Sequence, residues 1–182
     1  NMTVVAVADA EEMERFMLQS LDWPGPIYIR LAKGFDPIVT KPEWGFKIGK
    51  AVTVRQGGDV LLVSTGIMLG RMIEAADILA ANKIDCTVLH VPTVKPLDKD
   101  AILKCANKSR LVVTGEEHMR IGGFGSAILE MLSDAGNRTP VTRLGIEDAW
   151  THHYGSQNEL MADNGLHVQG IVKTVNLALS QI

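Results

Sequence analysis

The sequence predicts an α/β protein with three layers, in which helices cover both faces of a mostly parallel β-sheet that has one antiparallel edge strand. Short runs of apolar and β-branched residues alternate with segments whose apolar residues recur at helical spacing. The runs at 60–65 and 111–115 are apolar almost without interruption, as expected of strands buried on both faces of a parallel sheet. Crossovers between such strands are expected to be right-handed.

Composition and charge narrow the class of protein. The 182 residues suit one compact domain with an appendage, and the formal net charge of −3 comes without a basic stripe, so nucleic acid is not an expected partner. No apolar run approaches the roughly 20 residues that span a bilayer, and the start of the chain has no signal-peptide pattern. Cys86 and Cys105 form no metal-ligand pattern, which favours two reduced thiols in a cytoplasmic protein.

Residues 1–35 are predicted to form a separate first piece. Asp9 is placed to cap a helix that has Glu12 at its third position, and a strand is predicted at 27–31 after a break rich in Pro and Gly. One helix and one strand cannot enclose a core. The first piece is therefore expected to dock on another part of the protein.

Residues 36–46 are predicted to be a linker between domains. Their composition shifts to Pro, Lys, Asp and Trp, and Pro37 and Pro42 disfavour regular structure. Trp44 and Phe46 place two large rings in this loop. We expect them to anchor the linker onto the following domain rather than to form a ligand platform.

Residues 47–182 are predicted to form the main domain. Residues 48–55 and 60–65 are expected to pair as a hairpin, which would supply the antiparallel edge. Further strands are predicted at 85–90, 111–115 and 141–144, and helices at 68–82, 98–106, from the glycine-rich turn to about 135, 157–164 and 168–179. Residues 91–98 are expected to be a rigid connection, and residues 145–158 a polar loop.

The crest, residues 116–125, is the first candidate for a functional site. Its polar members are Glu116, Glu117 and His118, and its glycines are Gly122, Gly123 and Gly125. It follows the predicted strand 111–115, and the carboxyl end of a parallel strand is where polar groups converge in open α/β sheets. The carboxylates and imidazole could be an acid/base cluster or a polar interface with a partner chain. The interface is preferred, because no nucleophile or metal constellation lies nearby in sequence.

The glycines of the crest invite comparison with a dinucleotide-binding fingerprint, and Glu147 and Asp148 follow the next strand. In that fingerprint, however, the first glycine comes directly after the strand, so that pyrophosphate lies on the helix N-terminus. Here two carboxylates that would repel phosphate intervene. Close packing of the helix is the favoured role of these glycines.

The histidines outside the crest give no metal site. His152 and His153 are adjacent and point to different sides, so they are not expected to share one metal. His90, at a strand end, and His167, before the last helix, are expected to be structural residues with satisfied hydrogen bonds.

Arg30 is the second candidate site residue. It lies in the otherwise apolar run 27–31, and a buried guanidinium needs an anion or a carboxylate. Two interpretations are open from the residues alone. Arg30 either forms an ion pair across the docking surface or clamps a phosphate, for which its planar fork is well suited.

Several blocks in order resemble the C-terminal region of the thiamine-diphosphate-dependent transketolases. They are residues 25–34, 58–66, 92–98, 116–127 and 155–160. The first block resembles the close of the family's middle, pyrimidine-binding domain, and the others resemble its C-terminal domain. The resemblance implies that residues 1–35 end a pyrimidine-binding domain, that 36–46 form a linker, and that 47–182 form a transketolase C-terminal domain.

Three kinds of relative compete for this resemblance. The β subunits of 2-oxo-acid dehydrogenases usually carry a glycine where His118 stands. Deoxyxylulose-phosphate synthases resemble the chain around Arg30 and the glycines, but tend to lack the histidine after the paired glutamates. Split bacterial and archaeal transketolases are similar at both places and are favoured, while a non-enzymatic regulatory or partner-binding module that acts through the crest is the remaining alternative.

The resemblance implies an enzyme that transfers a two-carbon ketol unit from a ketose phosphate to an aldose phosphate, with Arg30 holding the substrate phosphate. Its cofactors would be thiamine diphosphate and Mg²⁺, bound through a Gly-Asp-Gly motif that does not occur here. This chain is therefore expected to supply no catalytic, cofactor-binding or metal-binding residue and to be inactive alone. Its expected partners are an N-terminal transketolase subunit or domain, a second copy in a homodimer, and sugar phosphates.

Overall fold

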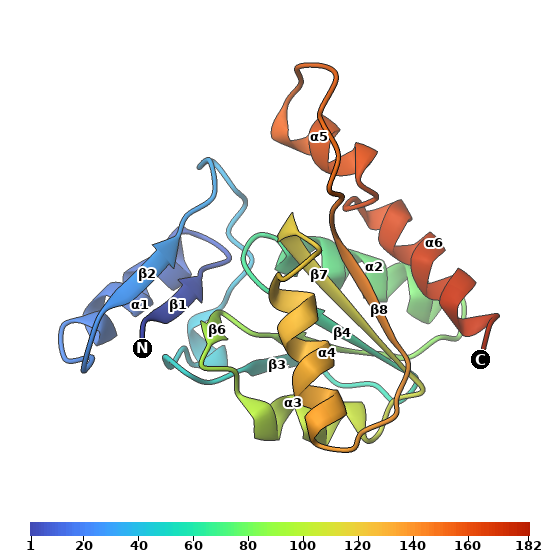
Figure 1. Cartoon of the computed structure of the whole chain (residues 1–182), viewed down its shortest axis with the longest axis horizontal. Helices are drawn as coiled ribbons and strands as arrows, with labels where there is room; N and C mark the ends of the chain where they lie inside the picture. Colours follow the sequence, from blue (N-terminus) through green and yellow to red (C-terminus); the bar gives the residue numbers. More distant parts are fainter.

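The computed structural model describes residues 1–182, with two β-sheets and helices packed around the larger one (Figure 1). The strands are β1 (Thr3–Ala6), β2 (Ile27–Arg30), β3 (Val52–Arg55), β4 (Val60–Ser64), β5 (Cys86–His90), β6 (Thr93–Lys95), β7 (Leu111–Met119) and β8 (Val141–Ile146). The helices are α1 (Ala10–Ser20), α2 (Met68–Ala81), α3 (Lys99–Ala106), α4 (Phe124–Asp134), α5 (Gln157–Asp163) and α6 (Val168–Leu179), with a 3₁₀ turn, η1, at Pro42–Trp44. No helix combines the length and the apolar character that a membrane span requires.

The larger sheet has five strands in the order β3-β5-β4-β7-β8. β4 pairs in parallel with β5 and β7, and β7 pairs in parallel with β8. Only β3, at the edge, runs antiparallel to its neighbour. The predicted fold class, a mostly parallel sheet with one antiparallel edge strand, is confirmed.

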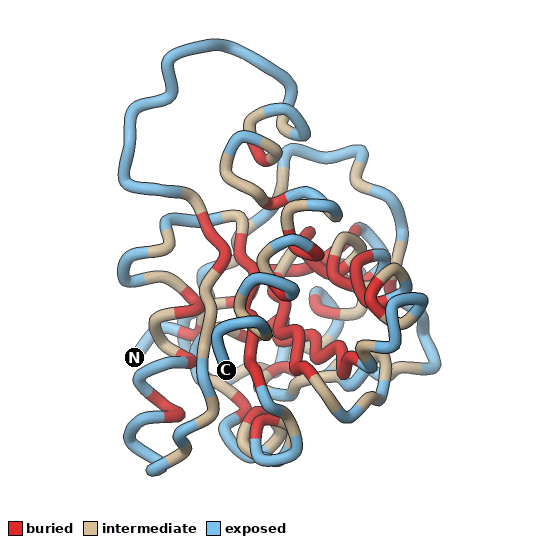
Figure 2. The backbone as a smooth tube through the Cα atoms, turned by 90° about the vertical axis from the view of Figure 1, so that its right-hand side faces the viewer, coloured by how far each residue is buried: buried red, intermediate tan, exposed pale blue.

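Alternate residues of β4 face two different cores, as the pleat of a strand requires. Val60 and Leu62 pack with α2 and α6 on one face of the sheet, whereas Leu61 and Val63 pack with α3 and α4 on the other. All four side chains are fully buried. Figure 2 shows the result as buried backbone concentrated inside the molecule, under a shell of exposed segments. This arrangement is the predicted three-layer architecture.

The predicted hairpin between residues 48–55 and 60–65 is wrong, because β3 pairs with β5 rather than with β4. The turn between β3 and β4 crosses β5, where Gly57 N donates to Thr87 Oγ1 at 3.0 Å and Thr87 Oγ1 donates to Gly57 O at 2.8 Å. A Cβ on Gly57 would lie 2.5 Å from the main-chain carbonyl carbon of Cys86. The crossing therefore needs glycine, and it gives the apolar β4 a parallel neighbour on each side.

The first piece contains a strand that the sequence patterns missed. β1 pairs in parallel with β2 and antiparallel with β6, which lies in the connection 91–98 that was expected to contain no strand. Strands this short show too few alternating residues to be recognised by pattern. The predicted docking is confirmed, because the first piece and the main domain share this small sheet and a core formed by Val5, Val7, Phe16 and Ile48.

The two aromatic residues of the linker pack in different places. Trp44 packs against the core that contains α2 and α6, so it anchors the linker onto the main domain as predicted. Phe46 instead joins the core that the first piece shares with Ile48 of the main domain, with its ring edge-on to Phe16 at a centroid distance of 6.2 Å. Phe46 therefore anchors the linker onto α1 as well as onto the main domain, which the prediction did not include.

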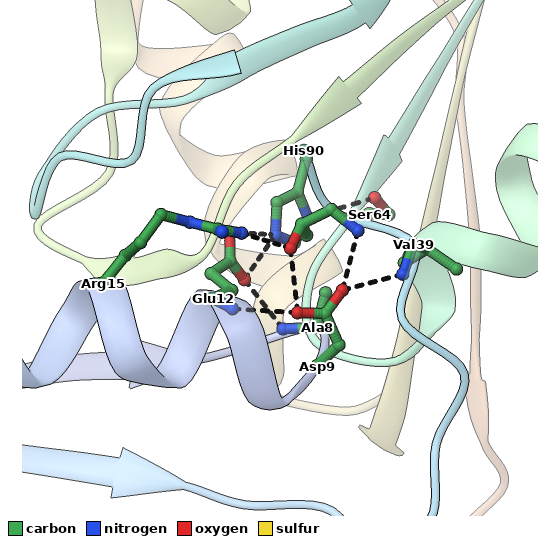
Figure 3. Close-up of polar contacts among 8 residues, drawn as sticks. Ala8, Asp9, Glu12, Arg15, Val39, Ser64 and His90 are labelled. Carbon is green, nitrogen blue, oxygen red and sulfur yellow. Dashed lines mark hydrogen bonds and ion pairs between the residues drawn. The ribbon is translucent and has the colours of Figure 1, made fainter. Parts of the chain in front are cut away.

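Asp9 caps α1 and also holds the start of the linker (Figure 3). Its carboxylate accepts hydrogen bonds from Glu12 N at 2.8 Å, Val39 N at 2.8 Å, Thr40 N at 2.7 Å and Thr40 Oγ1 at 2.8 Å. Burial raises the pKa of Asp9, but the donors from Glu12, Thr40 and Val39 together outweigh it and leave the pKa below its ordinary value.

The lowered pKa of Asp9 predicts how stability depends on pH. Its contribution is complete above the pKa of an unfolded aspartate, about 3.9, and is lost as the pH falls through the lower pKa of the folded state. We expect Asp9→Asn to lower the free energy of unfolding at pH 7 by about 1–2 kcal/mol and to reduce the further loss on acidification to pH 3. Urea unfolding at both pH values measures this, with Asp77→Asn at an exposed site as the control. Equal acid dependence of Asp9→Asn and wild type would contradict the assignment.

Cys86 and Cys105 are free thiols on β5 and α3. Burial raises the pKa of the Cys86 thiol to about 12, and burial also raises the pKa of Cys105. Because the thiolate is the reactive form, we expect native Cys86 to react with an aromatic disulfide at pH 8 roughly a thousandfold more slowly than in the unfolded chain. Labelling rates with and without guanidinium chloride measure this ratio, and similar rates would contradict the expectation.

Candidate functional site

A cleft of about 570 Å³ lies between the small sheet and the crest. One wall is the face of β1 and β2 that carries Val4, Ala6, Tyr28 and Arg30. The opposite wall consists of the crest and one side of α4 along its whole length. The cleft therefore brings together the two places that the sequence singled out separately, Arg30 and the crest.

The polar part of the crest is strand rather than loop. β7 runs through Glu116, Glu117 and His118 to Met119, although residue 115 was predicted to end it. β8 likewise continues to Ile146, beyond the predicted end at 144, and an irregularity in register separates its pairs with Gly115 and Met119. Pairs of β7 with β8 therefore stand on both sides of the polar residues, and this tertiary pairing includes them in the strand despite their low strand propensity.

Glu116 turns inward and caps α4. The residue is 1% exposed, and its carboxylate accepts hydrogen bonds from Phe124 N at 2.6 Å and Gly125 N at 2.8 Å. Burial raises the pKa of Glu116, although these two amides and the nearby His118 and Arg143 oppose the rise. The carboxylate occupies the positive end of the helix dipole and satisfies two amides that the helix leaves unpaired. The structure thus gives Glu116 a structural role.

Two glycines of the crest lie where any side chain would collide with a neighbour, whereas a Cβ on Gly122 would meet no atom within 4 Å. A Cβ on Gly123 would lie 2.2 Å from Oε2 of Glu116 and 2.3 Å from the carbonyl oxygen of Met119, and one on Gly125 would lie 2.5 Å from Oγ1 of Thr114. Close packing of the helix, the favoured interpretation, is confirmed for both positions. A dinucleotide site is excluded here, because a carboxylate already occupies the helix N-terminus where a pyrophosphate would bind.

Arg30 reaches across the cleft to the crest. Its Nη2 donates a hydrogen bond to the carbonyl oxygen of Glu117, and Arg30 forms no salt bridge with a carboxylate. The carboxylate of Glu117 instead accepts from Nε2 of Gln157 at 2.6 Å. Within this chain Arg30 therefore has no carboxylate partner. A guanidinium carries five N–H donors, so Arg30 keeps donors for an anion in the cleft that it lines.

The histidines differ in their burial and in their hydrogen-bond partners. His118 lines the cleft with its side chain 54% exposed, and its Nδ1 is 4.0 Å from Oε2 of Glu116. His90 is buried against Glu12, as expected of a structural histidine. The same expectation is wrong for His167, which is exposed at the N-cap position of α6 and forms no capping hydrogen bond through its side chain. In the loop before α5, His153 pairs with Asp163 at 2.9 Å. No group of three or more potential metal ligands exists in the structure.

The sequence interpretation missed three cleft residues, which are Tyr28, Lys95 and Lys99. Tyr28 could have been found, because it lies two positions from Arg30 on β2 and therefore on the same face. Lys95 reaches the cleft through the pairing of β6 with β1, where it lies opposite Val4. No local pattern signals such a long-range pairing, so neither Lys95 nor Lys99 could have been placed.

Comparison with known proteins agrees with this architecture. Residues 49–171 match the family model described as "Transketolase, C-terminal domain". The chain is 39% identical over 178 residues to a 1-deoxy-D-xylulose-5-phosphate synthase of Synechococcus sp. (strain JA-3-3Ab), covering 96% of this chain and 27% of the relative. It is 43% identical over 154 residues to a transketolase family protein of Sinorhizobium fredii, covering 82% of this chain and 44% of that protein.

Solved structures of other proteins share this fold. A protein described as a split-gene transketolase in an inactive beta4 tetramer superposes with a TM-score of 0.92 and 34% identity, over 99% of this chain and 58% of that one. A transketolase of Campylobacter jejuni shares the fold at 16% identity with a TM-score of 0.72, over 96% of this chain and 26% of that one. The chain thus spans only part of the length of these relatives. Because the family model covers more than half of it, the chain belongs to the transketolase C-terminal domain family.

Proposed function

We propose that this chain is the C-terminal portion of a transketolase, an enzyme that transfers a two-carbon ketol unit from a ketose phosphate to an aldose phosphate. In this proposal the chain supports assembly and supplies Arg30 to the substrate phosphate site, but it is not catalytic alone. Residues 1–35 would be the end of a pyrimidine-binding domain, 36–46 a linker and 47–182 the C-terminal domain. Two free cysteines, of which Cys86 is buried and Cys105 is partly exposed, suit an enzyme of the reducing cytoplasm.

The observation that carries the proposal is the contact between Arg30 and the crest. Arg30 and Glu117 are 87 positions apart in the sequence, yet the fold brings them together in one cleft. The carbonyl of Glu117 orients the guanidinium without neutralising its charge. An oriented, uncompensated guanidinium at the edge of a cleft is suited to hold a phosphate ester, because its fork matches two phosphate oxygens.

Thiamine diphosphate and Mg²⁺ would be held by other parts of the complete enzyme. The residues present do not fit a diphosphate–magnesium site, since the amides of the first turn of α4 already bind Glu116 and no cluster of metal ligands is present. We therefore assign no catalytic, cofactor-binding or metal-binding role to this chain. Its contribution is to bind and orient the phosphorylated substrate.

Partner surfaces are consistent with a larger assembly. Several large apolar side chains of the first piece are exposed, namely Leu18 at 67%, Leu21 at 78%, Leu31 at 60% and Phe35 at 107%. Such surface is commonly covered by another chain or domain. We propose that an N-terminal transketolase subunit or domain covers it and that the complete enzyme is a homodimer.

A second candidate function has a specific observation in its favour. Proteins named 1-deoxy-D-xylulose-5-phosphate synthase from Synechococcus, Gloeobacter violaceus and Heliobacterium modesticaldum are 37–39% identical to this chain over nearly its whole length. The same cleft would then bind the phosphate of that product. Both candidates are enzymes that act on sugar phosphates, and their products distinguish them.

Two measurements test the proposal. The complete enzyme is supplied with thiamine diphosphate, Mg²⁺, ketose and aldose phosphates and 2-oxo acids, and mass spectrometry identifies the product. A two-carbon shift between sugar phosphates supports the transketolase, 1-deoxy-D-xylulose 5-phosphate supports the second candidate, and neither product refutes both. Calorimetry should show that thiamine diphosphate with Mg²⁺ binds the complete enzyme but not this chain, and tight binding by the chain alone would contradict the proposal.

A further inference from the structure

A buried polar cluster joins the first piece to the main domain behind the cleft (Figure 3). Glu12 on α1 is 3% exposed and His90 at the end of β5 is 1% exposed. Nε2 of His90 lies 3.0 Å from Oε2 and 3.1 Å from Oε1 of Glu12. Oε2 also accepts a hydrogen bond from Ala8 N at 2.7 Å, and Nδ1 of His90 lies 3.5 Å from Oγ of Ser64 at the end of β4.

The cluster is satisfied in hydrogen bonding. Nε2 of His90 faces two carboxylate oxygens, and an N–H at this position would donate to them. In the neutral ring Nδ1 accepts from the hydroxyl of Ser64, and in the protonated ring it donates to Oγ. Although serine, histidine and glutamate form a chain as in some hydrolases, Ser64 is fully buried and no acyl substrate reaches it. The cluster therefore has a structural role, in which it holds separate segments of the chain together.

Each segment that the cluster holds continues directly into the cleft. Ala8 is preceded by Val7 and Ser64 is followed by Thr65, and both Val7 and Thr65 line the cleft. β6, which follows shortly after His90, carries Lys95 of the same wall. Glu12 and His90 together thus tie three segments that enter the cleft, with Glu12 bound to Ala8 and His90 bound to Ser64.

The position of Arg30 depends on the same link. Arg30 lies on β2, which pairs only with β1, and β1 leads directly into the segment that carries Ala8. A shift of α1 relative to β5 would therefore carry Arg30 away from the carbonyl of Glu117. A buried carboxylate and imidazole resist such a shift, because separating them without water would leave both unsatisfied.

We propose that Glu12 and His90 are positioning residues of the substrate phosphate site. Together with the pairing of β1 with β6, their contact fixes the separation between the wall that carries Arg30 and the wall formed by the crest, and so sets the fit of a sugar phosphate. This inference rests on the proposed function. Neither residue touches the substrate, and both act through Arg30.

Steady-state kinetics of the complete enzyme tests the proposal. Glu12→Ala and His90→Leu are each expected to raise KM for the phosphorylated ketose roughly tenfold while kcat stays within about threefold, because the misplaced group binds phosphate and performs no chemistry. The double variant should be no worse than the worse single variant, since the two residues act as one unit. Glu12→Gln should restore KM to within about threefold of wild type, because its amide can replace both contacts if the ring changes tautomer.

Two control variants separate positioning from loss of stability. Val175→Ala removes core volume on α6, away from the cluster, and should lower the melting temperature without changing KM. Asp77→Ala breaks an exposed ion pair with Arg55 and should change neither. If KM changes in Glu12→Ala no more than in Val175→Ala, or if the effects of Glu12→Ala and His90→Leu simply add, the proposal is overturned.

Hydrogen exchange of the complete enzyme gives a readout that does not depend on activity. Amides of β1, β2 and residues 116–120 should exchange faster in Glu12→Ala and His90→Leu than in wild type, and Val175→Ala should leave them protected. Unchanged protection of these amides in Glu12→Ala would overturn the positioning role. A wild-type enzyme that converts no sugar phosphate refutes the proposed function instead, and the exchange pattern then decides the link by itself.

Discussion

The complete enzyme carrying Arg30→Ala is expected to show a KM for phosphorylated sugars about a hundredfold higher than wild type, which corresponds to the loss of about 2.7 kcal/mol of binding free energy. The affinity for thiamine diphosphate should not change, because the cofactor site is proposed to lie outside this chain. The physical reason is that a guanidinium held by the carbonyl of Glu117 donates to phosphate oxygens, and alanine removes every donor. Steady-state kinetics with phosphorylated and unphosphorylated sugars measures the effect.

Two further variants serve as comparisons for Arg30→Ala. Arg30→Lys keeps the charge but loses the fork, so it should fall between wild type and Arg30→Ala. Arg110→Ala removes an exposed arginine that pairs with Asp59 just before β7, at the end of the strand opposite the crest, and should leave KM unchanged. An unchanged KM for phosphorylated sugars in Arg30→Ala would refute the phosphate role. An equal rise for unphosphorylated sugars would show that the cleft has been deformed instead.

Gly123→Ala is expected to lower the free energy of unfolding of this chain by about 3 kcal/mol or more. The new Cβ would lie 2.2 Å from Oε2 of Glu116, so the carboxylate must leave the amides of α4. Because Glu116 is buried, it would then remain without its donors. Thermal unfolding followed by circular dichroism should show a melting temperature lower by roughly 10 °C.

Gly58→Ala is the matched control for this substitution. A Cβ on Gly58 meets no atom within 4 Å, and the backbone at Gly58 needs no positive φ. The melting temperature of the Gly58→Ala variant should therefore stay within about 2 °C of wild type. Gly125→Ala should resemble Gly123→Ala, because its Cβ would meet Oγ1 of Thr114 at 2.5 Å. Equal melting temperatures for Gly123→Ala and Gly58→Ala would show that the crest does not depend on its glycines.

Local sequence patterns predicted the elements whose formation depends on neighbouring residues in the sequence. Asp9 and Asp98 were identified as N-caps from their positions before apolar periodic segments, and both accept hydrogen bonds from amides in the first turn of their helices. The uninterrupted apolar run of β4 indicated a central parallel strand, and the structure places it between β5 and β7. Such features depend on residues within a few positions of one another.

Features that depend on distant partners could not be predicted. The pairing of β1 with β6 joins two very short segments, and the crossing of Gly57 over β5 becomes evident only when both strands are in place. For the same reason the sequence identified Arg30 and the crest as separate candidates without indicating that they share a cleft. Glu12 looked like an ordinary residue in the first turn of a helix, and only the fold shows its contact with His90.

The most direct test of the central claim is a crystal structure of the complete enzyme with a phosphorylated ketose. We predict that the phosphate lies within hydrogen-bonding distance of the Arg30 guanidinium, in the cleft between β2 and the crest. Glu116 should still cap α4 in that complex. If its carboxylate left the cap and turned into the cleft, it would repel the phosphate. A phosphate bound elsewhere, with Arg30 contacting only the carbonyl of Glu117, would contradict the claim.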